Sequence, residues 1–242
     1  MKKKILTILL VGVLAITLTG CFDKTEESDK KDEKGETKIG LAFKKDYEEV
    51  NGQKNNNGKV HRSITIDEDN VFVETTPEKV SEMIDNGETF YVYFGSRLCP
   101  WCRSVIEKAV EVSIENGIEK IYYIDIWDDD GNEIFRDKYE VVDGELKRTI
   151  EGKDTYYKML DLFGDYLEDY EITTNAGDVV STGEKRIYAP NYVYINKGKI
   201  SRLVTGISEL QNDSREELTE DMLKDEEKTF DNFFVNACDD AC

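Results

Sequence analysis

The chain has 242 residues, with 52 Asp and Glu against 32 Lys and Arg, and a formal net charge of −20. This length is enough for one sizeable domain with appendages. A surface this acidic repels nucleic-acid phosphates and anionic lipid headgroups, which argues against nucleic-acid binding and against electrostatic attachment to a membrane.

The first twenty residues have the composition of a secretory signal peptide. Lys2, Lys3 and Lys4 are followed by an apolar segment from Ile5 to Thr17, which is too short to span a bilayer comfortably. The next residues, Leu18-Thr19-Gly20-Cys21, resemble the bacterial lipobox, whose cysteine is lipidated and becomes the mature N-terminus. The resemblance implies a lipid anchor on Cys21 at the extracytoplasmic face of a bacterial membrane. The alternative is an ordinary secretory signal with a coincidental cysteine.

Residues 21–60 are dominated by Lys, Glu, Asp, Gly and Asn, a composition that cannot bury a core. We therefore expect a flexible charged tether over 21–60 and a folded domain over 61–242. Removal of residues 1–20, which hold three lysines and no acids, lowers the net charge from −20 to −23. A lipid, and not surface charge, would then hold the protein at the membrane.

The first half of the domain alternates between strand and helix patterns. The expected elements are strands at 63–66 and 71–75, a helix opened by Thr76-Pro77, a strand at 90–95, a helix that begins at Cys99 and ends at Gly117, and a strand at 121–126. A β-α-β-α-β series of this kind predicts a largely parallel sheet with right-handed crossovers.

The motif Cys99-Pro100-Trp101-Cys102 lies between the strand at 90–95 and the following helix. Cys99 is expected at the helix N-terminus, where unpaired N–H groups and the helix dipole favour an anion. Its pKa should therefore be lowered, which makes it the attacking thiolate, with Cys102 as the resolving thiol. Arg97 and Arg103 flank the motif and could help to stabilise the thiolate.

The same Cys-x-x-Cys spacing also occurs in structural zinc sites, which need two further ligands. The chain offers only the isolated His61 and the terminal pair Cys238 and Cys242. We therefore favour redox chemistry, without a metal or cofactor. Carriage of copper or zinc by Cys99 and Cys102 is an alternative.

Residues 127–186 break the pattern and predict an insertion on one face of the domain. The acids from Asp128 to Asp130 do not have the spacing of an EF-hand, which favours a solvated turn or a helix start. Apolar residues from Tyr156 to Tyr170 predict an amphipathic helix that begins near Asp154, and 173–184 reads as a loop.

The end of the domain is predicted as a hairpin and a helix. Tyr192–Ile195 and Ile200–Val204 flank a tight turn, and a cis Ala189–Pro190 bond would explain a proline at the start of a core strand. Ser214-x-x-Glu217 has the spacing of a capping box and predicts the start of the last helix.

With these motifs the chain resembles the thioredoxin superfamily over about 120 of its residues. The resemblance implies an α/β fold, a three-layer α/β/α sandwich with a mixed sheet, here with a mainly helical insertion. It implies that Cys99 is the nucleophile and Cys102 the resolving thiol, and that Pro190, Ala189 and Trp101 line a substrate groove. More narrowly, the chain is similar to thioredoxin-like lipoproteins of Gram-positive bacteria such as bacteriocin transport accessory proteins.

One position departs from the family pattern. Thioredoxins place a buried acid six residues before the nucleophile, where it assists proton transfer from the second thiol; here Tyr93 occupies that place. Asp125, at the end of the next strand, could replace the acid, although a solvated position there is expected.

The resemblance implies a lipid-anchored thiol–disulfide oxidoreductase that acts on exported protein disulfides with an unidentified redox partner. Both directions of electron flow stay open. A different class of function is a non-catalytic binding module for a membrane exporter, which would use the insertion. Cys238 and Cys242 could form a terminal structural clip or a second redox pair.

Overall fold

The computed structural model describes residues 38–239 except residue 175, and side chains as far as Phe234. The expected signal peptide, Cys21 and Cys242 lie outside the described residues. For Cys238 only the backbone is described, in the last helix. The expectations about lipidation and about a terminal cysteine pair therefore stay predictions.

A five-stranded mixed sheet forms the centre of the domain, in the order β1-β3-β2-β8-β9. Its strands are β1 (Phe72–Glu74), β2 (Phe90–Gly95), β3 (Ile121–Asp125), β8 (Asn191–Asn196) and β9 (Lys199–Val204). β1, β3 and β2 are parallel, whereas β8 is antiparallel to both β2 and β9. The α/β class, the mixed sheet and the final hairpin are confirmed.

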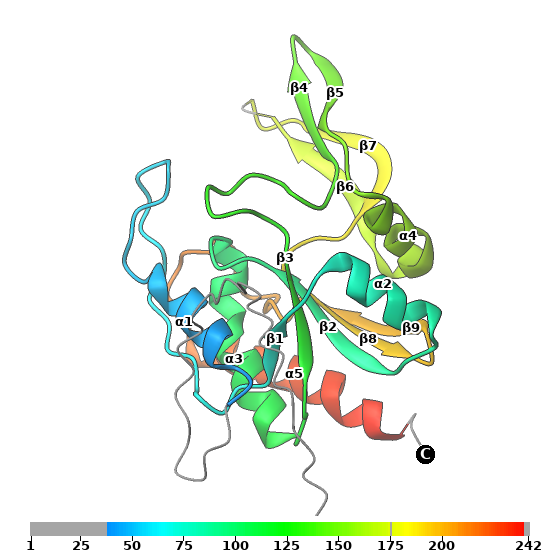
Figure 1. Cartoon of the computed structure of the whole chain (residues 1–242). Helices are drawn as coiled ribbons and strands as arrows, with labels where there is room; N and C mark the ends of the chain where they lie inside the picture. The colour runs from blue at the N-terminus through cyan, green and yellow to red at the C-terminus, as the bar shows by residue number, and fades with distance from the viewer. Residues whose placement is uncertain (1–37, 175, 240–242) are drawn as a thin grey trace, which may run out of the picture.

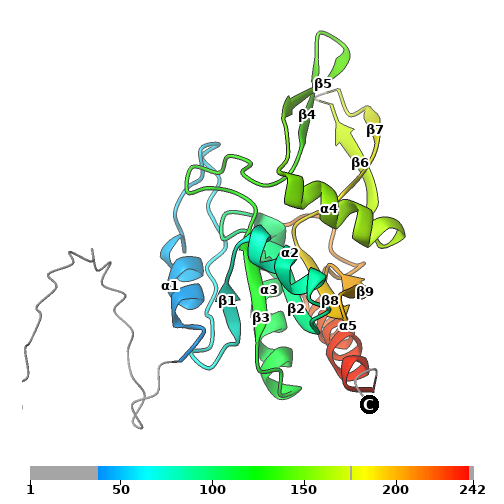
Figure 2. The ribbon, with the colours of Figure 1, turned by 45° about the vertical axis from the view of Figure 1, so that its right-hand side comes forward.

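Helices cover both faces of this sheet (Figures 1 and 2). On one face lie α1 (Leu41–Glu49), α3 (Pro100–Glu115) and α5 (Glu220–Asp239), and on the other lie α2 (Pro77–Asp85) and α4 (Asp154–Phe163). The side chains of β2 alternate between the two layers: Tyr91 and Tyr93 face α3, and Val92 faces α2 and α4.

The helix ends near the cysteine motif follow the sequence signals. The Thr76 hydroxyl accepts the Lys79 N–H at 3.2 Å and caps α2, whose first residue is Pro77. Gly117 follows the end of α3 and has a φ of +66°. The Gly117 N–H donates to the Ile114 carbonyl of the last helical turn. A residue without Cβ takes this left-handed conformation at little cost.

The described part of the expected tether is folded, so that expectation is wrong from residue 38 onward. Phe43 and Tyr47 of α1 are buried and make ring contacts with Phe72 and Tyr123 of the sheet. The segment is highly charged on average, but these two large rings on one face of α1 bury enough apolar surface to hold the helix on the sheet.

Two further boundaries were predicted wrongly. Residues 63–66 form no strand, because the Asn51 side chain takes up the N–H and C=O groups of Ile64. The last helix begins at Glu220 and not near Ser214, because the Thr219 hydroxyl caps it by accepting the Met222 N–H. Side chains thus compete with the expected backbone pairing.

The insertion is not mainly helical: it holds one helix, a 3₁₀ turn (η1, Gly164–Tyr166) and two hairpins. The hairpins pair β4 (Lys138–Val142) with β5 (Glu145–Ile150), and β6 (Glu168–Thr173) with β7 (Val179–Arg186). Figure 1 shows them rising together from one end of the sheet, above α4. Asp143 and Gly144 both have positive φ, the geometry of an Asp-Gly hairpin turn, so this dipeptide was the missed signal. The second half of the expected loop at 173–184 is strand β7.

Within residues 38–239, apart from residue 175, no helix is both long and apolar enough to cross a membrane.

Candidate functional site

Cys99 and Cys102 lie at the start of α3, at the end of β2. Cys99 is the N-cap residue, and its Sγ accepts the Cys102 N–H at 3.4 Å. Both thiols are free and buried, Cys99 with 4% of its surface exposed and Cys102 with none. The first residue of the motif therefore has the position at the helix terminus that the sequence predicts.

The Ala189–Pro190 peptide bond is cis, as predicted. It brings the start of β8 beside the motif, and the Cys99 thiol donates to the Ala189 carbonyl at 3.5 Å. Trp101 is half-buried and packs against the same core cluster as the cysteines and Ala189. Four of the predicted site residues, Cys99, Trp101, Cys102 and Ala189, are thus in one place, with Pro190 next along the chain.

The environment lowers the pKa of Cys99. Its largest cause is the hydrogen bond with the Cys102 side chain, joined by the backbone N–H groups of Cys102 and Trp101 and by the charge of Arg136, against burial. All of these contributions except burial stabilise the thiolate, the form in which a cysteine is nucleophilic.

The pKa of the second thiol, Cys102, is shifted in the opposite direction. Burial raises the pKa of Cys102, and its hydrogen bond with Cys99 and the Cys99 charge raise it further. A hydrogen bond with the Tyr93 side chain acts in the other direction. One cysteine is therefore prepared to attack, and the other to remain protonated until it is needed.

Tyr93 is completely buried, in the position where a thioredoxin has its acid, and its hydroxyl lies 2.9 Å from that of Tyr47. Asp125 is half-buried and not solvated as expected: it accepts the Tyr123 hydroxyl at 2.8 Å and the Trp127 N–H at 2.9 Å. Burial raises the pKa of Asp125.

The two arginines beside the motif have structural roles instead of contacts with the thiolate. Arg97 forms ion pairs with Asp46, Glu49 and Asp129, and so joins α1 to the loop after β3. Arg103 is completely buried and donates to the carbonyls of Arg62, Tyr47 and Arg97 and to Asn51.

The cation that acts on Cys99 comes from the insertion. Arg136 is buried, pairs with Glu133 at 2.6 Å and donates to the Ile187 carbonyl at 3.0 Å, two residues before Ala189. Arg186 reaches the same carboxylate at 3.3 Å. No local signal pointed to Arg136, because it is 37 positions from Cys99 and only the tertiary structure brings it near.

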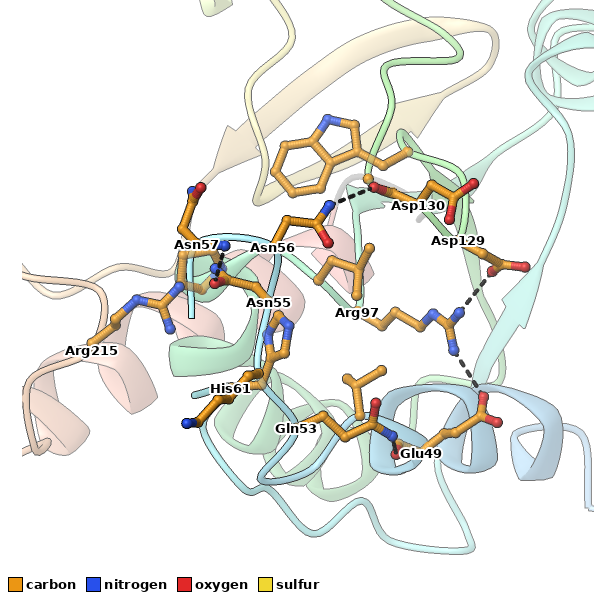
Figure 3. A pocket seen from close by; sticks show the side chains of 16 residues that line it. Glu49, Gln53, Asn55, Asn56, Asn57, His61, Arg97, Asp129, Asp130 and Arg215 are labelled. Atoms are coloured by element: carbon orange, nitrogen blue, oxygen red, sulfur yellow. Dashed lines mark hydrogen bonds and ion pairs between the residues drawn. The ribbon is translucent and has the colours of Figure 1, made fainter. Parts of the chain in front are cut away.

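A polar cleft of about 700 Å³ opens beside the motif, with Leu98 and Pro100 in its wall. Figure 3 shows its centre, where Arg97 lies between Glu49 and Asp129, with His61 and the side chains of residues 55–57 across from it. His61 is buried, and its Nδ1 has no hydrogen-bond partner. The cleft is rich in side-chain amides that can pair with a peptide backbone. Its lining does not include the predicted groove residues Ala189 and Pro190.

Among the side chains that the structure describes, no group of three or more His, Cys, Asp or Glu is arranged to hold a metal ion. The turn at Asp128 is a local one: the carboxylate accepts the N–H groups of Asp130 and Asn132. The predicted solvated turn is confirmed there.

No protein-family model matches the chain, and no curated protein matches it.

Proposed function

We propose that this protein is a thioredoxin-like thiol–disulfide oxidoreductase, anchored by lipid on Cys21 outside the cell, that acts on the disulfides of exported proteins. The observation that carries the proposal is the asymmetry of the dithiol. Cys99 caps α3 with a lowered pKa, and Cys102 is fully buried with a raised one. An attacking thiolate and a protected resolving thiol are what two-step disulfide exchange requires.

The architecture supports the thioredoxin-like part of the proposal. The strand order β1-β3-β2-β8-β9, the helix that starts within the Cys-x-x-Cys motif and the cis-proline beside it all occur together. The two hairpins and α4 are then additions between β3 and β8.

In the reducing direction the Cys99 thiolate attacks one sulfur of a client disulfide, and the other client sulfur leaves as a thiolate. Cys102, once deprotonated, attacks Cys99 Sγ, which releases the second client thiolate and forms the Cys99–Cys102 disulfide. Two electrons pass to the client, and a redox partner must return them. The reverse sequence oxidises a client dithiol, and the reduction potential of the pair decides which direction operates.

The cleft of Figure 3 is a suitable place for the client segment next to its cysteine. It lies beside Pro100, and the amides of residues 55–57 can pair with an extended backbone. This assigns to the segment after α1 a role in client binding.

Trapping tests the proposal directly. The full-length C102S variant, expressed in a Gram-positive host, should accumulate mixed disulfides between Cys99 and exported proteins, visible as bands that disappear on reduction. The C99S/C102S variant is the matched control and should trap none. Absence of any trapped species with C102S, together with a wild-type dithiol that does not react with model disulfides, would contradict the oxidoreductase and favour the non-catalytic binding module.

Location is tested separately. C21A should pass from the membrane fraction to the culture medium and lose incorporation of a labelled fatty acid, while its dithiol chemistry stays unchanged. Retention of C21A at the membrane would contradict the anchor without affecting the redox proposal.

A further inference from the structure

The resolving thiol lies among buried tyrosine hydroxyls. Tyr47 of α1, Tyr93 of β2 and Tyr192 of β8, which we call the tyrosine cluster, are each at most 1% exposed and belong to the same core as Cys102. A hydroxyl needs a hydrogen-bond partner when it is buried, so three tyrosine hydroxyls in the core that holds Cys102 indicate a role beyond packing.

Two contacts orient the Tyr93 hydroxyl. It lies 2.9 Å from the Tyr47 hydroxyl, and it is the tyrosine side chain that lowers the otherwise raised pKa of Cys102, which lies in the same buried core. If Tyr47 donates to Tyr93, the hydrogen of Tyr93 is free to point at the Cys102 sulfur. Arg103, the residue after Cys102, donates to the Tyr47 carbonyl at 2.8 Å and so holds α1 in place.

The Tyr93 ring packs directly against the backbone at Gly95. A Cβ at this position would lie 2.2 Å from the hydroxyl oxygen and the adjacent ring carbon of Tyr93. On its faces the ring is stacked between Tyr192, at 4.4 Å, and Tyr123, at 5.4 Å. Tyr93 therefore has little freedom to turn its hydroxyl away from Cys102.

The other hydroxyls differ in their partners. Tyr123 donates to Asp125, whereas the Tyr192 hydroxyl is buried without a partner. The titratable groups that face the tyrosine cluster from neighbouring elements are Arg103 on α3, Asp125 on β3 and Glu226 on α5. Neither carboxylate acts on the pKa of Cys102, whereas the Tyr93 side chain and the Ser96 backbone both lower it, so Tyr93 is the side chain that favours the Cys102 thiolate.

We propose that Tyr93 is a further catalytic residue, whose hydroxyl donates a hydrogen bond to the Cys102 thiolate in the resolving step, and that Tyr47 is the positioning residue that aims it. This rests on the proposed function and replaces the acid of a thioredoxin by a donor that stabilises the thiolate without taking its proton.

The resolving step moves one proton to water and one electron pair to the client sulfur. The Cys102 thiol loses its proton to water, and the thiolate accepts the Tyr93 hydrogen bond. It then attacks Cys99 Sγ in the mixed disulfide, where the bond between Cys99 and the client breaks and the Cys99–Cys102 bond forms. The electron pair leaves on the client sulfur, which takes a proton from water.

The test uses 5,5′-dithiobis(2-nitrobenzoate) as a model disulfide with the reduced full-length protein in a C21A/C238S/C242S background, so that Cys99 and Cys102 are the remaining thiols. Attack by Cys99 releases one coloured thiolate, and resolution by Cys102 releases a second, so stopped-flow absorbance separates the two steps. In Y93F the second phase should slow by about three- to tenfold, because each unit of higher pKa lowers the thiolate fraction tenfold while nucleophilicity recovers about half of that on a logarithmic scale. The first phase should stay unchanged, and the pH midpoint of the second phase should rise.

Y47F should slow the second phase less than Y93F and also raise its midpoint. Y123F is the matched control, because it removes a hydroxyl from the same stack that bonds Asp125 instead of Cys102. An unchanged second phase in Y93F, or an equal loss in Y123F, would overturn the proposal.

If Y93F does not fold, 3,5-difluorotyrosine at position 93 replaces it in the test. Its more acidic hydroxyl is a stronger hydrogen-bond donor, so the second phase should become faster. An unchanged rate of the second phase would overturn the proposal. Failure of the proposed function is distinguishable, since the parent protein with Tyr93 and only Cys99 and Cys102 as thiols would then release no second thiolate.

Discussion

The two faces of the central sheet are built from the same strands but have different chemistry. On the face covered by α1, α3 and α5, neighbouring strands present Tyr93, Tyr123 and Tyr192. On the face covered by α2 and α4 they present mainly aliphatic residues and phenylalanine, such as Val92, Ile124 and Val193, and one partly buried tyrosine, Tyr122. The hydroxyls are thus concentrated where the cysteines lie. One face serves as a packed support, and the other combines packing with the polarity that a reacting thiol needs.

The largest expected effect is on the cysteine face. C99S should lower the rate of disulfide exchange by at least about a thousandfold, because a serine hydroxyl is not ionised at neutral pH and cannot replace the thiolate. Stopped-flow reaction with a model disulfide measures it. C102S is the control and should keep the first step but lose the second. A C99S protein that still releases the first thiolate would show that Cys99 is not the nucleophile.

The opposite face should respond in stability and not in chemistry. Phe163 of α4 is fully buried and meets Phe94 edge-on at 5.9 Å. F163A should lower the free energy of unfolding by about 3–5 kcal/mol, which urea titration measures. The rate of Cys99 alkylation in the folded variant should be unchanged. A changed rate would mean that the two faces are not independent.

The third prediction concerns a buried acid on the cysteine face. Glu226 is fully buried, neither carboxylate oxygen has a partner, and burial raises its pKa to about 8. Between its unfolded pKa near 4.5 and about 8, the unfolded chain loses this proton and the folded protein keeps it. Stability of the wild type must therefore fall as the pH rises through that window.

E226Q removes this dependence. At pH 8 it should be more stable than the wild type by up to about 4.5 kcal/mol, since the pKa difference from 4.5 to about 8 corresponds to about 1.4 kcal/mol per unit, and at pH 4.5 the two should be nearly equal. Thermal unfolding at both pH values measures the difference. E227Q, at an exposed neighbouring position, should show little change. Parallel pH curves for E226Q and the wild type would contradict the prediction.

The smallest expected effect tests the space that Gly95 leaves for Tyr93. G95A places a methyl group against the Tyr93 ring and should cost about 1–3 kcal/mol of stability. The displaced hydroxyl should also slow the resolving step, whereas G117A at the end of α3 should cost stability alone, because of its positive φ. A normal second phase in G95A would show that Tyr93 tolerates movement.

Much of the site could be read from the sequence, because its signals are local. Cys99 at a helix start, Pro77 in a first turn, Pro190 before a strand and Gly117 after a helix each depend on a few consecutive residues. The hairpin at Asp143-Gly144 has an equally local signal, two consecutive residues that favour positive φ, although the helical periodicity from Tyr156 onward favours a helical insertion.

The remaining errors have a physical cause in long-range contacts. The average composition of 21–60 indicates a tether, but two buried rings of α1 are enough to hold residues 41–49 against the sheet. Backbone groups at 63–66 pair with side chains of α1 and its following turn, which no strand pattern can reveal.

The sequence by itself determined the class of the fold, the dithiol, its place at a helix terminus and the cis-proline, since each follows from steric and hydrogen-bonding preferences of neighbouring residues. Only the tertiary structure decided what surrounds the two sulfurs. Tyr47 meets Tyr93 across 46 positions, and Arg136 acts on Cys99 across 37. Burial and charge act through space, and the order of residues along the chain does not specify those distances until the chain has folded.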